Sequence, residues 1–371
     1  MIKLLTVIGA RPQIIKAAAF SRAVAAHNSE VCEKILHTGQ HYDENMSGVF
    51  FDELGIPQPD YNLGVGSGSH GEQTAKMIEG IEKVLTGKLA DRNGECYSDW
   101  DGVVLYGDTN STLAGAVAAS KLHIPVFHIE AGLRSFNMTM PEEINRIVCD
   151  QLSTILFAPT KTAVDNLREE GFFDEKRGFR RVVNCGDIMY DNTLYFSSKA
   201  PENKYGAYVL ATVHRQENTD SIERLTGIFS ALSKIAGTTK VVLPLHPRTA
   251  KVLAANNIDT SQLTIIPPAS YLETLSLEKH AKLVLTDSGG VQKEAFFLER
   301  PCIILRDETE WVEIVQNGAG ILAGADCEKI LGAYSKLAGH KVEFPRLFGD
   351  GKACEKIINA LVKTKYDYGE S

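Results

Sequence analysis

The sequence predicts an α/β protein built of two Rossmann-like halves with a cleft between them. Its 371 residues exceed what one hydrophobic core usually organises. Short apolar runs alternate with helical patterns along almost the whole chain, which is typical of parallel sheets covered by helices. Ligands bind outside the carboxyl ends of parallel strands, so we expect the strand ends of both halves to face the cleft.

Apolar runs separated by helical patterns define the expected first half. The expected strands cover residues 2–9, 32–39, 101–108, 124–132 and 154–160, and the expected helices cover 12–27, 71–89, 111–123 and 141–153. Two of these helices have proline in the first turn, where its missing N–H would be unpaired in any case. We place this first domain at residues 1–175.

A second series of apolar runs follows the charged segment 168–180. Its expected strands cover residues 181–186, 207–214, 239–246, 263–268, 281–290 and 301–307. We place the second domain at residues 176–350. The last segment, 351–371, contains an isolated amphipathic helix and is kept separate from it.

Composition and charge narrow the possible functions. A net charge of −8 argues against a nucleic-acid partner and against binding to an anionic membrane surface. No stretch approaches the roughly 20 apolar residues of a membrane span. The 7 cysteines form no CxxC pair, which suits a reducing cytoplasm and predicts neither a zinc site nor a disulfide framework.

Carboxylates follow two successive strands of the first half. Asp108 stands in "GDTNST" and Glu130 in "HIEAGLR", while "MPEEINR" adds Glu142 with Arg146 four residues later. Carboxylates at the ends of parallel strands are placed for general acid–base chemistry. For Glu142 and Arg146, however, the spacing alone favours an i,i+4 ion pair that stabilises the helix N-terminus.

Cations and glycine turns stand at other strand ends. "GARPQIIK" brings Arg11, which can bind an anion bidentately, and Lys16, which taken alone reads as an ordinary solvated residue. "TVHRQEN" carries His214 and Arg215, which can hold a diphosphate leaving group.

A strand followed by Ser-Gly-Gly and a helix in "TDSGGVQKEA" offers backbone N–H groups to a phosphate, although a plain strand–helix turn explains the glycines equally well. Glu294, later in this segment, can accept hydrogen bonds from ribose hydroxyls. A cleft with one cationic and one acidic end suits a nucleotide diphosphate bound to a sugar that undergoes proton chemistry.

The motifs together resemble those of the bacterial non-hydrolysing UDP-N-acetylglucosamine 2-epimerases: "GARPQ", "HTGQH", "GDTNST", "HIEAGLR", "PEEINR", "HRQEN" and "LTDSGGVQKEA" with "RDETEW". Their order and spacing match over essentially the whole chain. The resemblance implies a GT-B fold with acid and base residues in the first domain, UDP bound by the second, and a last helix that packs back on the first. It also implies a cytoplasmic homodimer that needs no cofactor and supplies N-acetylmannosamine-type sugars for surface polysaccharide.

Carried over position by position, the resemblance assigns acid–base work at the sugar to Asp108, Glu130 and Glu142, with Arg146 as their partner and His214 beside the diphosphate. No metal ligand is expected. The residues expected to contact the UDP-sugar are Arg11, Lys16, Arg134, Arg215, Tyr271, Ser288, Gly289, Gly290, Glu294 and Arg306.

The implied reaction interconverts UDP-GlcNAc and UDP-ManNAc, by elimination of UDP to a 2-acetamidoglucal and re-addition. Two features depart from the usual family pattern: Ala10 and Gln13 replace the common Thr and Glu, and "SFNMTM" (135–140) is similar to relatives that act on UDP-2,3-diacetamido-2,3-dideoxy-glucuronate. That uronate is therefore the second expected substrate. A GT-B glycosyltransferase and a non-catalytic nucleotide-sugar sensor also fit the predicted fold, because a fold does not fix a function.

Overall fold

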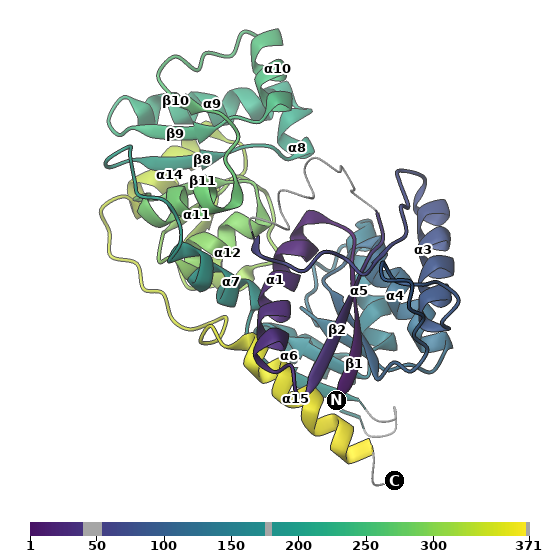
Figure 1. Ribbon diagram of the computed structural model, residues 1–371. Coiled ribbons are helices and arrows are strands. Elements are labelled where there is room, and N and C mark those ends of the chain that lie inside the picture. Colours follow the sequence, from purple (N-terminus) through teal and green to yellow (C-terminus); the bar gives the residue numbers. More distant parts are fainter. Residues whose placement is uncertain (40–53, 175–179, 369–371) are drawn as a thin grey trace. The chain divides into compact units, whose positions relative to one another are not determined.

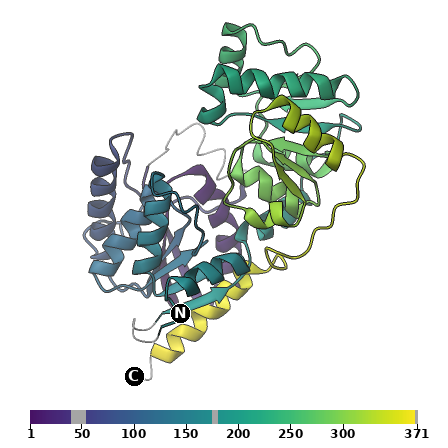
Figure 2. The same cartoon turned by 180° about the vertical axis from the view of Figure 1, so that it is seen from behind.

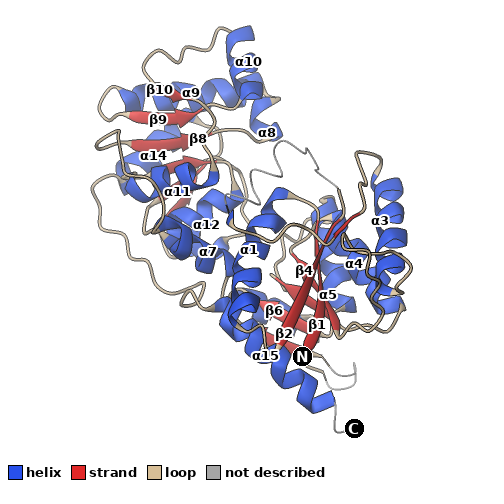
Figure 3. Cartoon of the chain, in the orientation of Figure 1, coloured by secondary structure: helices blue, strands red, loops and turns tan. Residues whose placement is uncertain are grey.

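The computed structural model describes residues 1–39, 54–174 and 180–368, and it divides into two compact units. The first unit comprises Met1–Asn192 together with Leu347–Ser371, and the second comprises Thr193–Arg346. Figure 1 labels the helices and strands of both units, and Figure 2 gives the opposite view. Each unit is a parallel sheet covered by helices, as the secondary-structure colouring of Figure 3 shows.

The first unit is organised by a parallel sheet with the strand order β3-β2-β1-β4-β5-β6-β7. Its central strands are buried nearly throughout, because helices cover both faces and leave no face for water. The order reverses direction at the boundary between β1 and β4, so the turns after these two strands lie side by side. The strands are β1 (Ile2–Ile8), β2 (Val31–His37), β3 (Tyr61–Asn62), β4 (Gly102–Tyr106), β5 (Val126–Ile129), β6 (Ile155–Ala158) and β7 (Arg181–Asn184).

Helices cover the first sheet in two layers (Figure 1). On one side α3, α4 and α5 pack side by side, and on the other α1 contacts α15. Leu5, Val7, Val103 and Leu105 from the strands form one core with Met77 and other residues of the first of these layers. The helices are α1 (Arg11–Ala26), α3 (His70–Leu85), α4 (Asn110–Lys121), α5 (Pro141–Leu152), α6 (Lys161–Glu169) and α15 (Ala353–Tyr368), and α7 (Ile188–Ser197) contains the boundary with the second unit.

The second unit repeats this plan with the strand order β10-β9-β8-β11-β12-β13, all parallel. Here the order reverses between β8 and β11. The strands are β8 (Val209–Thr212), β9 (Val241–Pro244), β10 (Thr264–Ile266), β11 (Val284–Thr286), β12 (Cys302–Ile304) and β13 (Gly320–Leu322). The helices are α8 (Gln216–Thr219), α9 (Ile222–Ala236), α10 (Pro247–Ala255), α11 (Tyr271–His280), α12 (Gly289–Phe297), α13 (Val312–Gln316) and α14 (Cys327–Leu337).

The first unit extends further along the chain than the expected domain 1–175. The strand formed from "RVVNCG", expected to open the second half, is β7, and it pairs with β6 at the edge of the first sheet. The boundary therefore falls after Asn192 rather than after residue 175, and the return to the first unit begins at Leu347. A side chain fixes this return, because the Asp191 carboxylate accepts from the N–H groups of Ala353 (3.0 Å) and Cys354 (2.8 Å) at the start of α15.

Among the helices of the described residues, none is long and apolar enough to cross a membrane.

Candidate active site

Two glycine-containing turns meet at the reversal point of the first sheet. One follows β1 and leads into α1, and the other follows β4 and carries Asp108. Gln13 joins them: its amide nitrogen donates to the carbonyl of Tyr106 (3.0 Å), and its side-chain oxygen accepts from the N–H groups of Gly9 (2.9 Å) and Ala10 (3.1 Å). Gln13 is buried, so these bonds are shielded from water. Its departure from the usual family residue thus has a structural role that the sequence pattern did not reveal.

The turn at Gly107 lies against two charged groups, Lys16 and Glu130. Gly107 has a φ of +63°, and a Cβ there would lie 3.1 Å from Glu130 Oε2 and 3.2 Å from Lys16 Nζ. Only glycine combines this conformation with so little space. Lys16 on α1 forms an ion pair with Glu130, and both side chains are largely buried. Lys16 is therefore more than the solvated residue that its position alone suggested.

Asp108 is held by groups from α5. Arg146 donates to Asp108 Oδ2 from Nε (3.1 Å) and Nη2 (2.6 Å), and Asn145 donates to its backbone carbonyl (2.9 Å). Burial raises the pKa of Asp108; the cations of Arg146 and Lys16 oppose this rise, and the charge of Glu130 adds to it. The net effect is a pKa above the ordinary value. A carboxyl group in this state holds a proton more readily than an exposed aspartate does.

Glu130 follows β5 in a left-handed conformation, with a φ of +74°. Left-handed backbone is unfavourable for a residue with a side chain and persists where the surroundings impose it. Its N–H donates to the carbonyl of Phe157 on β6 (3.1 Å), and its carboxylate pairs with Lys16. The strained backbone directs a nearly buried carboxylate to the carboxyl edge of the sheet, next to Asp108.

The two glutamates that begin α5 lie in different environments. Glu142, the predicted acid, is exposed, whereas Glu143 is buried with 1% of its area exposed. Glu143 pairs with Arg146, so the partners of Arg146 among the described residues are Asp108 and Glu143, and the i,i+4 pair with Glu142 is not formed. The Glu143 carboxylate also accepts hydrogen bonds from the N–H groups of Ser135 (3.0 Å) and Phe136 (2.9 Å). The sequence did not reveal Glu143, because adjacent glutamates in one turn give no signal for which of them faces inward.

Arg134 corrects one expectation. Its guanidinium is buried, donates twice to Glu170 (2.6 and 2.7 Å) and pairs with Asp150 at 2.8 Å. Nη1 also donates to the carbonyl of Leu133 (2.7 Å). These contacts engage its donors within the fold, which argues against the predicted contact with a substrate.

His128 on β5 belongs to the same buried network. Nδ1 lies 2.7 Å from Asp150 Oδ1, and Nε2 lies 2.8 Å from the carbonyl oxygen of Gly107. Both partners are acceptors, so the ring carries a proton on each nitrogen. Burial opposes the charged ring, but Cys149 and Asp150 outweigh it and raise the pKa of His128 well above its ordinary value.

In the second unit, Asp287 ties together the turns after β8 and β11. Its buried carboxylate accepts hydrogen bonds from the backbone N–H groups of His214 (3.0 Å) and Arg215 (3.0 Å) and from the side chain of Asn218 (3.1 Å). His214 Nδ1 lies 3.4 Å from the same carboxylate, and its ring is half exposed. The "HRQEN" and "TDSGG" motifs are therefore neighbours at the carboxyl edge of this sheet, joined by a residue that the motif pattern alone did not single out.

Ser288, Gly289 and Gly290 form the start of α12, as the turn motif predicted. The Ser288 side chain caps the helix by accepting from the N–H of Val291 (3.5 Å). A Cβ at Gly289 would lie 2.5 Å from Glu310 Oε1, so the loop that carries "RDETEW" approaches the turn closely. Glu310 pairs with Arg306 at 2.9 Å. Burial raises the pKa of Glu310, but Arg306 and Arg215 outweigh it and leave the pKa below its ordinary value.

The remaining predicted residues differ in exposure. Arg11 is exposed at the first position of α1, and Tyr271 is buried at the first position of α11 with its ring 5.7 Å from that of Phe196. Glu294 is buried on α12, and its charge, together with burial, raises the pKa of Glu278 on α11 well above the ordinary value. Of the "HTGQH" motif, Gln40 and His41 lie outside the described residues.

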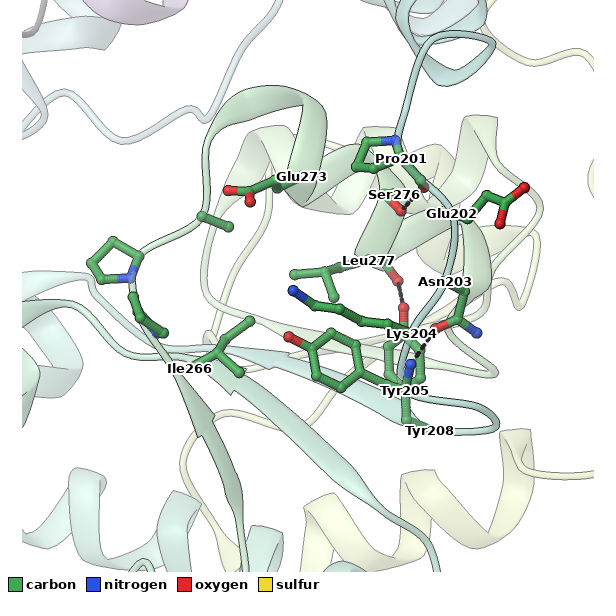
Figure 4. Close-up of a pocket in the computed structure, with 13 residues that line it drawn as sticks. Pro201, Glu202, Asn203, Lys204, Tyr205, Tyr208, Ile266, Glu273, Ser276 and Leu277 are labelled. Atoms are coloured by element: carbon green, nitrogen blue, oxygen red, sulfur yellow. Dashed lines mark hydrogen bonds between the residues drawn. The ribbon is translucent and has the colours of Figure 1, made fainter.

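A pocket of about 310 Å³ lies elsewhere in the second unit, between the loop 201–205, the end of β10 and α11 (Figure 4). Its wall is held by hydrogen bonds from the Ser276 hydroxyl to the carbonyl of Pro201 (2.5 Å) and from the Tyr208 hydroxyl to the carbonyl of Leu277 (2.6 Å). None of the predicted binding residues lines it. The pocket is therefore separate from the candidate site.

The predicted residues thus form two groups, each at the carboxyl edge of its own sheet. The first unit brings together Lys16, Asp108, Glu130 and Arg146, and the second brings together His214, Arg215 and the start of α12. Within the described parts of the chain, no group of three or more His, Cys, Asp or Glu side chains is placed to hold a metal ion.

Comparison with known proteins identifies the family. The family model described as UDP-N-acetylglucosamine 2-epimerase matches residues 22–362. The chain is 48% identical to the Pseudomonas aeruginosa UDP-2,3-diacetamido-2,3-dideoxy-D-glucuronate 2-epimerase, over 97% of this chain and 99% of that protein. It is 43% identical to a solved structure of Methanocaldococcus jannaschii UDP-GlcNAc 2-epimerase in complex with UDP-GlcNAc and UDP, with a TM-score of 0.83 and coverage of 98% and 100%.

A Phytolacca americana protein solved with UDP-2fluoro-glucose shares only the fold, with 13% identity, a TM-score of 0.57 and coverage of 98% of this chain and 94% of that one. The two parallel-sheet domains of the GT-B class and the resemblance drawn from the motifs are confirmed. The chain is an epimerase-type isomerase and belongs to the UDP-N-acetylglucosamine 2-epimerase family.

Proposed function

We propose that the chain is a UDP-N-acetylglucosamine 2-epimerase that interconverts UDP-GlcNAc and UDP-ManNAc. The observation that carries this proposal is the pair of carboxylates at neighbouring strand ends of the first unit, Asp108 with Arg146 and Glu130 with Lys16. Inversion at C2 needs one group that removes the C2 proton and another that returns a proton to the opposite face. Asp108, Glu130 and Glu142 are the proposed acids and bases.

The proposed chemistry is elimination followed by re-addition. The C1–O bond to UDP breaks and its electron pair leaves with the diphosphate, while a carboxylate takes the C2 proton and the C1=C2 bond of a 2-acetamidoglucal forms. UDP then adds back to C1 as a carboxylic acid delivers a proton to the other face of C2. The raised pKa of Asp108 suits a group that must hold a proton during part of this cycle.

The diphosphate is assigned to the second unit. Backbone N–H groups at the start of α12, the cation Arg215 and the neighbouring His214 ring suit a leaving group that gains negative charge. We assign the ribose hydroxyls to Glu294, and further contacts to Arg11, Tyr271 and Arg306. A cytoplasmic homodimer and a reaction without cofactor complete the proposal.

The uronate UDP-2,3-diacetamido-2,3-dideoxy-glucuronate is the second candidate substrate. It is favoured by the 48% identity to the Pseudomonas aeruginosa enzyme and by the "SFNMTM" segment. A C6 carboxylate needs a cation or several donors, however, and Arg134, a cation among the residues expected to contact the UDP-sugar, is engaged by Asp150 and Glu170. This geometry favours the uncharged hydroxymethyl group of UDP-GlcNAc.

Proton NMR in deuterated water tests the proposal directly. Incubation with UDP-GlcNAc should yield UDP-ManNAc, with deuterium at C2 of both the product and the recovered substrate. A GT-B glycosyltransferase would need an acceptor and would leave the C2 hydrogen in place. Conversion with complete retention of the original C2 hydrogen would exclude elimination, and the absence of conversion of either UDP-sugar would exclude the epimerase.

A further inference from the structure

Glu143 makes contacts that reach well beyond its own helix. Its carboxylate stands in the first turn of α5 and is 1% exposed. It accepts from the backbone N–H groups of Ser135 (3.1 and 3.0 Å) and Phe136 (2.9 Å), and it pairs with Arg146. Burial raises the pKa of Glu143, but these N–H groups and Arg146 outweigh it, so the pKa is lowered and the group stays ionised near neutral pH.

The loop 135–140 that Glu143 holds is ordered by local hydrogen bonds. Asn137 donates from its N–H to the Ser135 hydroxyl (3.3 Å) and accepts from the N–H (3.1 Å) and hydroxyl (2.7 Å) of Thr139. On this fixed loop, Phe136 and Met138 are 76% and 59% exposed. Phe136 has a φ of +57°, a conformation that its backbone contact with Glu143 helps to hold.

The same carboxylate is linked to the candidate acid. Arg146 lies between Glu143 and Asp108 and donates to both. One buried anion thereby fixes the orientation of the guanidinium that holds Asp108, and it also fixes the backbone from which Phe136 projects. Glu143 therefore helps to hold both the Arg146–Asp108 pair and the backbone of the loop 135–140.

A simpler role for Glu143 is stabilisation of the helix N-terminus, which acidic residues provide in many helices. Such a carboxylate stays near the N–H groups of its own first turn or of its cap. The backbone N–H groups that Glu143 accepts from belong instead to a loop seven and eight residues earlier in the chain. Its pair with Arg146 is an i,i+3 contact on the same helix, and Arg146 extends it to Asp108. Its contacts serve the site more than the helix.

We propose that Glu143 is a positioning residue that couples Asp108 to the loop 135–140, and that Phe136 and Met138 of this loop contact the sugar. This inference rests on the proposed function. It identifies a determinant of sugar specificity: the loop exposes two apolar side chains, and its backbone is held by the residue that also pairs with the Arg146 partner of Asp108. Loss of Glu143 should therefore alter both proton transfer and the choice of sugar.

The experiment compares E143Q, F136A and the double variant with E79Q in the full-length protein. Glu79 makes an exposed ion pair with Lys83 on α3 and serves as the matched control for removing one paired carboxylate. Wild-type C2 exchange in deuterated water is measured first, and its absence would count against the proposed function alone. The readouts are kcat and KM for UDP-GlcNAc and for the diacetamido uronate, and the Kd of UDP by calorimetry.

We expect E143Q to lower kcat/KM by about tenfold to a hundredfold, the usual effect of misplaced reacting groups. The Kd of UDP should stay within about twofold of the wild-type value. The ratio of kcat/KM for UDP-GlcNAc to kcat/KM for the diacetamido uronate should change. The double variant should lose little more than E143Q alone, because both changes act through one loop. If E143Q does not fold, E143D, which keeps the charge but cannot span all three partners, replaces it.

Four results would overturn the inference. The first two are a kcat/KM of E143Q that equals that of E79Q, and effects of E143Q and F136A that add fully in the double variant. The others are wild-type kinetics of F136A on both sugars, and a loss of UDP affinity in E143Q as large as its loss of kcat/KM.

Discussion

Arg146 donates from two nitrogen atoms to a single oxygen of Asp108, at 3.1 and 2.6 Å. Among the described residues, none donates a hydrogen bond to the other carboxylate oxygen. One oxygen is thus fixed and the other is available to a proton. This arrangement orients the carboxyl group and leaves one of its oxygens open to proton transfer.

Loss of either strand-end carboxylate should remove acid–base function and leave nucleotide binding intact. Asp108→Asn and Glu130→Gln should each lower kcat by about a hundredfold or more, the usual contribution of a general acid or base. The UDP Kd should change little, because we assign the diphosphate to the second unit. Steady-state kinetics and calorimetry on the same preparations check both parts, and near-normal turnover in either variant would refute its role.

Glu142 is tested by Glu142→Gln. The side chain is exposed and does not form the i,i+4 pair with Arg146. If Glu142 is only a surface residue of the helix, the substitution should leave kcat almost unchanged. A proposed acid at the sugar predicts a fall in kcat of about a hundredfold without a change in melting temperature. Unchanged kcat would assign Glu142 to the surface and leave Asp108 and Glu130 as the acid–base pair.

Gly107→Ala should damage the site more than the fold. The alanine would have to adopt the left-handed backbone conformation of Gly107, and its methyl group would lie 3.1 Å from the Glu130 carboxylate. We expect a loss of about 1–2 kcal/mol in the free energy of unfolding and a larger loss of kcat/KM, because the pair of Glu130 and Lys16 must shift. Urea unfolding and kinetics check this, with Gly94→Ala as the control, since that glycine also has a positive φ but has open space around it.

Arg134→Met should destabilise the protein without altering substrate affinity. The buried Asp150 carboxylate would lose a partner, and breaking a buried pair costs about 3–5 kcal/mol. Arg168→Met, which removes an exposed pair with Asp165, should cost less than about 1 kcal/mol. A tenfold rise in KM for Arg134→Met with unchanged stability would restore Arg134 as a substrate contact.

His128 should remain charged well above neutral pH. Its pKa is raised in the folded protein, so its contribution to stability is complete below the unfolded pKa of about 6.5 and is lost as pH rises through the folded pKa. Asp150 acts in the opposite sense, because its pKa is lowered and its contribution is lost as pH falls in the acid range. Nitrogen-15 NMR should show both ring nitrogens of His128 protonated at pH 8, and a neutral ring there would contradict the network.

Much of the fold was readable from the sequence because buried parallel strands are continuous apolar runs. The sheet to which "RVVNCG" belongs could not be predicted, because the sequence of an edge strand does not show which strand it pairs with. In the structure it is β7 and pairs with β6 of the first sheet. At the site, motif positions led to Asp108 and Glu130. The partners of Arg134 were not predicted, because Glu170 lies far along the chain and only the folded structure brings the two together.

The return of the chain at Leu347 sets an order of events during synthesis. The segment that completes the first unit is made after all of the second unit, so α1 can contact α15 only once residues 193–346 have been synthesised. Until then the Asp191 carboxylate has no N–H groups of Ala353 and Cys354 to accept. The first unit therefore begins before the second unit is made and is completed only after it.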